Sequence, residues 1–143
     1  MFISEVLKAK GDLVFTAAPT ETVGAVAAML FARRVGALVV VDGDREVVGI
    51  VAERDVVRVV AEEGGTGLTR PVSHCMTRDV IFAGLHETVD TLLERMTDRR
   101  FRHLPVCEDG RLVGIVSIGD LVKSKIAETV AEAEGLRAYI HAA

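Results

Sequence analysis

Two short stretches of the sequence end in a carboxylate whose surroundings could support ligand binding. VGIVAERD ends at Asp55, and VGIVSIGD ends at Asp120, 65 residues further along the chain. A carboxylate has two acceptor oxygens and can receive both hydroxyl groups of a cis-diol, such as that of a ribose. Ser117 and Asp120 also stand at the spacing of a capping box, in which the same side chains only begin a helix. For Asp120, the residue types leave sugar binding and helix capping open.

The first phrase favours sugar binding more than the second does. At the position of Ser117 it has Ala52, which offers no side-chain oxygen to a capping box, and yet Asp55 is present. An acid in the first turn of a helix still gains from the helix dipole. A carboxylate without its capping partner nevertheless indicates a second role for Asp55.

The residues before and within the second phrase add further candidates. Pro105 has no N–H group, which predicts a strand edge or an irregularity beside a cleft. Ser117 could donate to a phosphate oxygen, and Gly119 would leave the amides of a helix N-terminus open to an anion. Arg102 and His103 precede Pro105. The alternatives are that Arg102 is a solvated charge, that His103 is an ordinary strand residue and that Ser117 is only an N-cap.

The cysteines and the remaining histidines do not predict a metal site. Cys75 and Cys107 form no CxxC pattern, so neither a disulfide framework nor a zinc site is expected. Cys107 lies in an apolar run and is interpreted as a small buried thiol. His74, Cys75 and His86 fit no standard zinc spacing and are interpreted as linker and loop residues.

The elements that must position these residues occur twice. Apolar residues at i, i+3, i+4 and i+7 predict an amphipathic helix after Thr22 and another after Thr88, with the threonines as N-caps. Each helix is followed by an apolar strand, a turn rich in Asp and Gly, and a second strand, a pattern typical of a hairpin. The expected strands are 13–15, 37–41 and 46–51 in the first half and 80–82, 103–107 and 112–116 in the second. Second helices are expected to begin near Glu53 and Gly119.

Each half is therefore a β-α-β-β-α unit of about 60 residues, which is marginally stable alone. We expect an α/β (α+β) fold in which two such units pack sheet to sheet with pseudo-twofold symmetry. The expected boundaries are 1–62 for the first repeat, 63–71 for a glycine-rich linker, 72–125 for the second repeat and 126–143 for a helical tail. The tail carries a drifting apolar stripe that is expected to cover a partner subunit or the protein's own surface, and Gly135 is its candidate break.

Composition narrows the function. The net charge of −4 and the scattered basic residues argue against nucleic acid as a partner. The most apolar helical stretch, VGAVAAMLFA, is shorter than the ~20 residues of a membrane span. The N-terminus lacks the apolar core of a signal peptide, so a cytoplasmic protein is expected. No nucleophile stands beside a base, and no phosphate-binding loop is present, so an enzyme is not expected.

The repeated unit, the two phrases and the stretch RHLPV at 102–106 resemble the CBS domain. Two such units in tandem resemble a CBS pair, or Bateman module, over roughly residues 3–125. The resemblance implies a cleft between the repeats that binds an adenosyl compound such as AMP, ADP, ATP, NAD or S-adenosylmethionine. It also implies a homodimer that forms a flat disk of four units.

The resemblance further assigns roles to residues. It implies that Asp120 holds the ribose hydroxyls, with Ser117 in the same nucleotide site. Around the adenine it places the stretch RHLPV, with Pro105, together with Thr77, Val80 and Ile81. Arg102 and His103 could then reach the phosphates.

The first repeat departs from this pattern. It has Gly36, Ala37, Val39 and Ala52 where the second has Arg102, His103, Pro105 and Ser117. It gains basic residues near Asp55, namely Arg54, Arg58 and Lys10. We therefore expect unequal sites, of which the second holds a mononucleotide and the first is empty or holds the far end of a longer ligand such as NAD.

Two functions follow as hypotheses. The first is a non-enzymatic sensor whose ligand shifts a conformational equilibrium that a partner protein detects. The second is a structural dimerisation scaffold without a physiological ligand. Thermal stabilisation by adenosyl compounds separates the two hypotheses.

Overall fold

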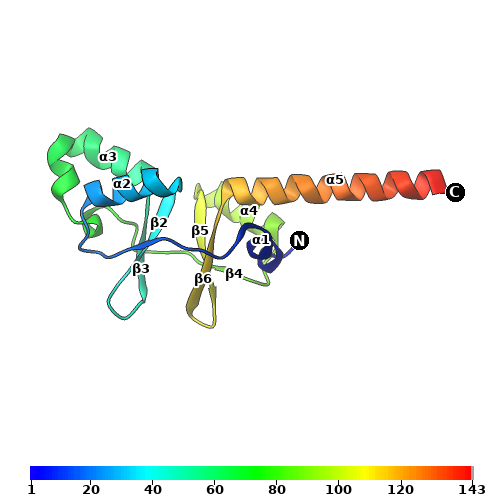
Figure 1. Cartoon of the computed structure of the whole chain (residues 1–143), viewed down its shortest axis with the longest axis horizontal. Coiled ribbons are helices and arrows are strands. Elements are labelled where there is room, and N and C mark those ends of the chain that lie inside the picture. The colour runs from blue at the N-terminus through cyan, green and yellow to red at the C-terminus, as the bar shows by residue number, and fades with distance from the viewer. Residues whose placement is uncertain (143) are drawn as a thin grey trace. The chain divides into compact units, whose positions relative to one another are not determined.

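A computed structural model describes residues 1–142, which form two compact units (Figure 1). One unit is Val14–Ile81. The other combines Met1–Leu13 with the chain from Phe82 onward. Each unit contains the strands of one repeat, and each also contains a segment that precedes the first strand of the other repeat.

The two units are built from the same series of elements. The unit Val14–Ile81 consists of β1 (Thr16–Ala17), α2 (Val23–Arg33), β2 (Ala37–Val41), β3 (Val47–Ala52), α3 (Glu53–Glu63) and the 3₁₀ turns η1 (Gly64–Thr69) and η2 (Val72–His74). The other unit consists of α1 (Ile3–Lys10), β4 (Ala83–Gly84), α4 (Val89–Arg99), β5 (His103–Glu108), β6 (Arg111–Ser117) and α5 (Ile118–Ala142). The predicted β-α-β-β-α order is thus confirmed in both repeats.

Each unit has one three-stranded sheet. The strand orders are β1-β2-β3 and β4-β5-β6, in which the short first strand is parallel to its neighbour and the hairpin is antiparallel. Equivalent residues occupy equivalent registers, since Val39 pairs with Ile50 and Pro105 pairs with Ile115. The mixed α/β fold is therefore confirmed.

The helices that follow the short strands begin at the predicted caps. Thr22 Oγ1 accepts a hydrogen bond from Ala25 N at 3.1 Å, and Thr88 Oγ1 accepts one from Thr91 N at 3.2 Å. Both helices end at an arginine in the left-handed region, Arg34 at φ 55° and Arg100 at φ 58°. The repeat therefore extends to the backbone conformation of the helix ends.

The leading strands begin about three residues later than predicted. They are Thr16–Ala17 and Ala83–Gly84 in place of 13–15 and 80–82. Ala17 and Ala83 are the buried residues of these strands, whereas Leu13 and Phe82 are exposed. Leu13 and Phe82 thus lie outside the core, whereas Phe15 is half-buried against it.

Pro105 lies in the central strand of its sheet, so of the two predicted alternatives the strand edge is wrong, whereas an irregularity fits the register shift between Val106 and Cys107. In the first repeat the equivalent Val39 N donates to Phe15 O at 3.4 Å. Pro105 has no N–H to donate, and β4 pairs only with Val106 and Cys107. The proline is tolerated because the parallel ladder begins one residue beyond it.

The glycines of the repeated phrases mark where a segment crosses the sheet. A Cβ on Gly49 would lie 2.6 Å from Met76 Sδ and 3.0 Å from Thr77 O. A Cβ on Gly114 would lie 2.8 Å from both terminal carbons of Leu7. Each crossing segment precedes the first strand of the other repeat in the sequence, so the two repeats exchange their leading segments.

The exchange also builds the cores. Val72, Cys75 and Met76 are buried in the core of the unit Val14–Ile81, although the predicted second repeat, 72–125, includes them. In the other unit the helix α1 buries Ile3, Val6 and Leu7. The predicted boundaries at 62 and 72 follow the sequence repeats. Because of this exchange, the compact units begin and end at other residues, and the predicted boundaries stay a prediction.

The predicted linker and tail are both helical. Residues 64–69 form the 3₁₀ turn η1 against α3, where a Cβ on Gly67 would lie 2.4 Å from Val59 Cγ1. The tail belongs to α5, which is continuous to Ala142, so the predicted break at Gly135 is wrong. Residue 143, the end of the predicted tail, lies outside the described residues. Within residues 1–142, no helix is both long and apolar enough to cross a membrane.

Candidate functional site

Asp120 begins helix α5 as one half of a complete capping box. Asp120 Oδ2 accepts a hydrogen bond from Ser117 N at 2.8 Å, and Ser117 Oγ accepts one from Asp120 N at 3.1 Å. The two bonds satisfy backbone N–H groups that a helix start leaves without partners. The capping interpretation of Ser117 and Asp120 is confirmed.

Asp55 caps helix α3 without a serine. Asp55 Oδ2 accepts from Ala52 N at 2.8 Å, the same bond that Asp120 makes to Ser117. The hydrogen bond from the backbone to the acid of a capping box is thus present even where alanine replaces the serine. Asp55 thus has a capping role although Ala52 offers no side-chain oxygen, and the second role inferred for Asp55 stays a prediction.

Each of the two carboxylates also contacts a cation that is anchored on a backbone carbonyl. Lys10 Nζ lies 2.7 Å from Asp120 Oδ2 and donates to Ile115 O at 2.7 Å. An Arg58 side-chain nitrogen lies 3.1 Å from Asp55 Oδ1 and donates to Cys75 O at 3.2 Å. Both carboxylates are thus held from two sides.

Lys10 therefore belongs with Asp120 and not with the first-repeat group in which the sequence placed it. The reason is the exchange of leading segments, since α1 precedes the first repeat but packs in the unit that contains the second. Arg58 does lie beside Asp55, and Arg54 lies exposed in the first turn of the same helix, α3.

The two carboxylates differ in what remains available to a ligand. Among the described residues, both oxygens of Asp55 have a partner, whereas the partners of Asp120 all contact Oδ2. The Asp120 side chain is 26% exposed and the Asp55 side chain 12%. Asp120 therefore keeps an accessible acceptor oxygen, Oδ1, that Asp55 lacks.

The surroundings of Asp120 favour its ionised form. Burial acts to raise its pKa, but the hydrogen bonds from Lys10 and Ser117 outweigh burial and hold the pKa below the usual 3.8. The carboxylate is consequently a fixed negative charge near neutral pH. It can accept hydrogen bonds from hydroxyl groups and donate none.

The start of β5 lies beside this capping box. His103 pairs with Ser117 across the hairpin, and Ile118 N donates to Arg102 O at 2.8 Å. The structure thus brings together in one unit six of the predicted residues: Arg102, His103, Pro105, Ser117, Gly119 and Asp120. A Cβ on Gly119 would meet only Ser117 Oγ, at an ordinary 3.6 Å, so the structure shows no steric need for glycine there.

Three of the residues predicted around the adenine, Thr77, Val80 and Ile81, lie in the other unit. Thr77 exchanges two backbone hydrogen bonds with Ile50 of β3, and Val80 and Ile81 are half-buried at the end of that unit. The structure does not unite these three residues with Asp120 in one compact unit.

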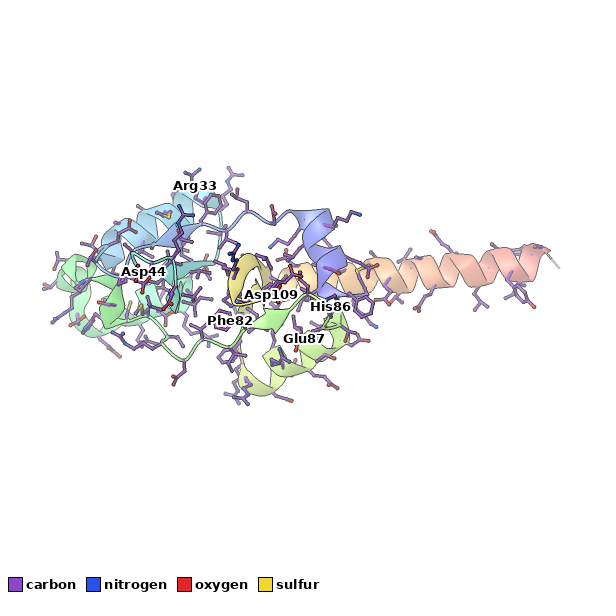
Figure 2. All side chains as sticks on the ribbon, turned by 90° about the horizontal axis from the view of Figure 1, so that it is seen from below. Arg33, Asp44, Phe82, His86, Glu87 and Asp109 are labelled. Atoms are coloured by element: carbon purple, nitrogen blue, oxygen red, sulfur yellow. The ribbon has the colours of Figure 1, made fainter. Side chains whose placement is uncertain are left out.

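An ion pair near β4 was not found from the sequence. Arg95 donates to both oxygens of Glu87 at 2.7 and 2.9 Å, and Gly84 N donates to Glu87 Oε2 at 3.1 Å. The hydrogen bond from Arg95 outweighs burial and lowers the pKa of Glu87. Figure 2 labels Glu87, His86 and Asp109, and all three line one hollow. The only signal in the sequence was an acid and a base eight residues apart.

The equivalent glutamate of the first repeat has no such arginine. Met29 stands where the second repeat has Arg95. Within the described residues, Glu21 Oε2 is buried and accepts no hydrogen bond. The two repeats therefore differ at this junction as well as at the capping carboxylate.

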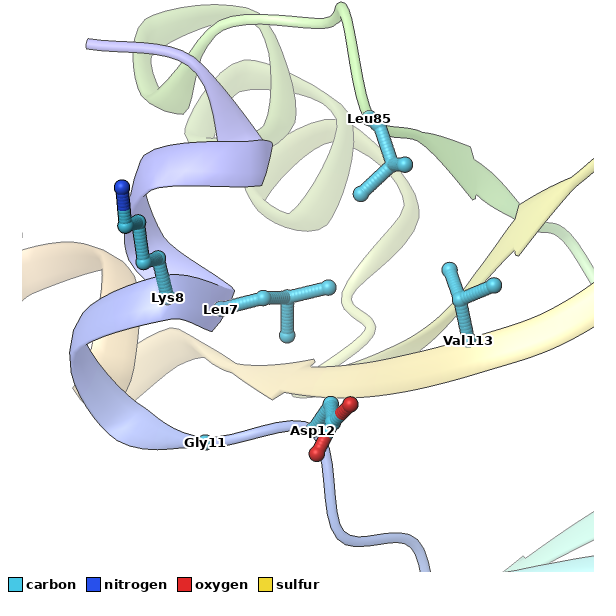
Figure 3. A pocket seen from close by; sticks show the side chains of 6 residues that line it. All are labelled: Leu7, Lys8, Gly11, Asp12, Leu85 and Val113. Carbon is cyan, nitrogen blue, oxygen red and sulfur yellow. The ribbon is translucent and has the colours of Figure 1, made fainter.

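Two hollows adjoin α1. One of about 380 Å³ lies at the end of α1, between Leu7 and Val113 (Figure 3). The other, of about 240 Å³, lies between α1 and α5 and includes Lys10, Asp120 and Lys123 in its lining. Lys10 and Asp120, which are bonded to each other, thus both lie on the wall of the second hollow.

The histidines and cysteines do not converge. In residues 1–142, no three residues among His, Cys, Asp and Glu are grouped so that they could hold a metal ion. His74 Nε2 lies 3.4 Å from Glu63 Oε2 in one unit, and His86 lies in the other. Cys75 and Cys107 are both free thiols, and burial raises the pKa of each. Cys107, predicted to be a small buried thiol, is half-buried.

Two β-α-β-β-α units, each with a capping carboxylate after its hairpin, define a tandem-repeat α/β protein. A model of the CBS domain matches residues 11–62 and 72–126. The chain belongs to the CBS domain family. It is 34% identical over 146 residues to CBS domain-containing protein CBSX3, mitochondrial, of Arabidopsis thaliana, a match that covers 96% of this chain and 71% of that protein.

Solved structures of similar chains share this fold. The CBS-domain containing protein ATU1752 from Agrobacterium tumefaciens is 46% identical with a TM-score of 0.85, covering 87% of this chain and 92% of that one. CBS domain protein PAE2072 from Pyrobaculum aerophilum, solved in complex with AMP, is 30% identical with a TM-score of 0.75, covering 84% and 89%. The CBS domain pair of protein MJ0100, solved with 5-methylthioadenosine and S-adenosyl-L-methionine, is 25% identical with a TM-score of 0.80, covering 90% and 98%.

Proposed function

We propose that this chain is a regulatory module that binds an adenosyl nucleotide through Asp120 and has no catalytic activity of its own. The observation that carries the proposal is the Asp120 carboxylate, which is ionised, held in place by Ser117 and Lys10, and open at Oδ1. Two similar CBS proteins have been solved with adenosyl ligands, AMP in one case and S-adenosyl-L-methionine with 5-methylthioadenosine in the other.

The chemistry of the proposed contact follows from the donor and acceptor groups. The ribose 2′- and 3′-hydroxyls donate to the Asp120 carboxylate, and an ionised acceptor strengthens such bonds. Lys10 has three N–H groups, of which two are directed at Ile115 O and Asp120 Oδ2. The third can meet a phosphate, as can the side chains of Arg102 and His103.

Regulation would follow from differential affinity. A ligand that binds one conformation more tightly shifts the population toward that conformation, and a partner protein can detect the shift. AMP, ADP, ATP and NAD are the proposed physiological ligands, and dimerisation of the module is part of the same proposal. The cytoplasmic location expected from the sequence stays a prediction.

The proposal is tested by thermal unfolding with AMP, ATP, NAD and S-adenosylmethionine. A ligand at 100 times its Kd stabilises the folded state by about 2.7 kcal/mol. We expect at least one of these ligands to raise the Tm of the wild-type protein, and Asp120→Asn to abolish the increase. Asp55→Asn should retain it, because both oxygens of Asp55 are already engaged.

Asp44→Asn, in the exposed turn between β2 and β3 (Figure 2), is the matched control for the loss of one negative charge. If no adenosyl compound stabilises the wild-type protein, the sensor proposal is wrong and the scaffold hypothesis is favoured. If Asp120→Asn responds as strongly as wild type, binding does not depend on this carboxylate.

A further inference from the structure

The second half of α5 is exposed on all sides. Leu121, near the start, is the only buried residue of this helix among those described. Lys125 pairs with Asp90 and Glu128 with the amino terminus, after which every residue from 129 to 142 is exposed. Figure 1 shows this part of α5 extending beyond the other elements of its own unit. A lone helix of this length is marginal in water, so a partner is expected to stabilise it.

One face of α5 is apolar. Its members are between 44% and 61% exposed: Val122, Ile126, Val130, Leu136 and Ile140. Val122 and Ile126 are rotated by about 100° and 140° from Leu121 around the helix. The apolar face is therefore not the face by which α5 packs on its own unit.

The spacing along this face is that of a coiled coil. The positions advance alternately by four and three residues, through Val122, Ile126, Thr129, Ala133, Leu136 and Ile140, while Val130 lies beside the series at an e position. In heptad notation Ile126, Ala133 and Ile140 are a positions, and Val122, Thr129 and Leu136 are d positions. Leu136 at d and Ile140 at a match the combination that favours two parallel strands, whereas Thr129 and Ala133 are the polar and the small position of the seam.

The flanking charges agree with that arrangement. Glu132 is a g residue and Arg137 is the e residue five positions later. In a parallel pair, g of one helix meets the following e of the other, so Glu132 would face Arg137 of a second copy on both sides of the seam. In an antiparallel pair with the same seam, Glu132 would face Glu132 of the second copy, because g positions then meet each other.

We propose that residues 122–142 form a parallel two-stranded coiled coil with the same residues of a second copy of this chain. The occupant of the apolar face is thus another α5, and the two chains are joined with their C-termini at the same end. The inference rests on the helix face and its charges. It does not depend on adenosyl binding.

Disulfide cross-linking of the full-length protein tests the proposal. In a Cys107→Ser background, Leu136→Cys places a thiol at a d position, where two parallel helices bring equivalent residues within the ~7 Å Cα separation that a disulfide allows. Ala138→Cys, on the opposite face, is the matched control. We expect Leu136→Cys to form covalent dimers at least about tenfold faster than Ala138→Cys at equal concentration, because pairing raises the effective concentration of the thiols.

Charge variants supply a second measurement. In the Leu136→Cys protein, Glu132→Arg should slow cross-linking because Arg would face Arg137, and adding Arg137→Glu should restore it. Ala131→Arg on the opposite face should have no effect.

Ile140→Cys, an a position, repeats the assay if Leu136→Cys is poorly folded by circular dichroism. Equal cross-linking at the core positions and at residue 138, or no rescue by the double exchange, overturns the proposal. Thermal shifts with AMP are measured on the same variants and report separately on ligand binding.

Discussion

Lys10 connects the N-terminal helix to the carboxylate that begins α5. Its ammonium group contacts Asp120 Oδ2 and Ile115 O, both at 2.7 Å. This contact brings a positive charge from residue 10 to a capping box at residues 117–120. An interaction between exposed charges is weak, but this pair is about three-quarters buried and anchored on a backbone carbonyl.

We predict that Lys10→Met raises the pKa of Asp120 toward its usual value. The lysine is one of two groups that lower this pKa against the effect of burial, so its removal leaves only Ser117 to oppose burial. Carbon-detected NMR of the Asp120 carboxyl group against pH measures the change. Lys8→Met, on the same helix, is the control. An unchanged pKa in Lys10→Met would show that the contact is not formed in solution.

The pH dependence of stability follows from the same shift. A carboxyl group with a lowered pKa in the folded state stabilises the protein above its unfolded pKa of about 3.9, and this contribution is lost as the pH falls through the folded value. Because Lys10→Met brings the two values closer, its destabilising effect should be present at pH 7 and disappear in acid.

At the scale of elements, the turn from the short strand into the next helix differs between the repeats. Glu87 is bound by Arg95 and by Gly84 N, whereas among the described residues Glu21 Oε2 is buried without a partner. A buried polar atom without a hydrogen bond costs free energy, while a two-pronged arginine–carboxylate pair is among the stronger surface interactions.

We predict opposite effects of the same substitution at the two positions. Glu87→Gln should lower the free energy of unfolding by about 1 kcal/mol at pH 7, since the charged pair is lost. Glu21→Gln should leave stability unchanged or raise it, because an uncharged amide is less costly to bury than a carboxylate. Urea denaturation at pH 7 measures both. The loss in Glu87→Gln should vanish as the pH falls below the lowered pKa of Glu87, and equal losses in the two variants would contradict this account.

Local patterns in the sequence were sufficient to predict most elements. Thr22 and Thr88 could be predicted as N-caps because each threonine lies only three residues before the backbone amide that it caps. The helical tail was found too, but the break at Gly135 was not observed. An exposed glycine costs a helix only about 1 kcal/mol, and its neighbours are good helix formers.

Contacts between distant residues could not be read in the same way. Lys10 and Asp120 are 110 residues apart, and no local pattern predicts their pairing. Pro105 was placed at an edge because the sequence did not show that β4 would start one residue beyond it. The duplicated Asp55 and Asp120 were found, but their difference depends on Lys10 and Arg58, which only the folded chain brings to them.

At the scale of the whole molecule, the exchange of leading segments makes each repeat incomplete without the other. The unit Val14–Ile81 takes Val72, Cys75 and Met76 into its core, and these residues lie beyond the sequence repeat. Gly49 has no side chain, and this leaves room for Met76 and Thr77 to cross the sheet beside it. A cut at the end of the repeat would therefore remove part of the core and expose the sheet.

We predict that a fragment of residues 14–81 folds better than a fragment of residues 1–62. The first contains the whole unit, whereas the second carries an α1 that belongs elsewhere and lacks the crossing segment. Circular dichroism and urea unfolding of the two fragments measure this. The expected result is a cooperative transition for 14–81 alone. A cooperative transition of equal midpoint for 1–62 would contradict the exchange.

The most direct test of the central claim is a crystal structure of the full-length protein grown with AMP. The account predicts both ribose hydroxyl oxygens of AMP within about 3 Å of the Asp120 carboxylate, with the phosphate directed toward basic side chains. AMP bound with its ribose away from Asp120, or no AMP at saturating concentration, would contradict the claim that this carboxylate is the sugar-binding group.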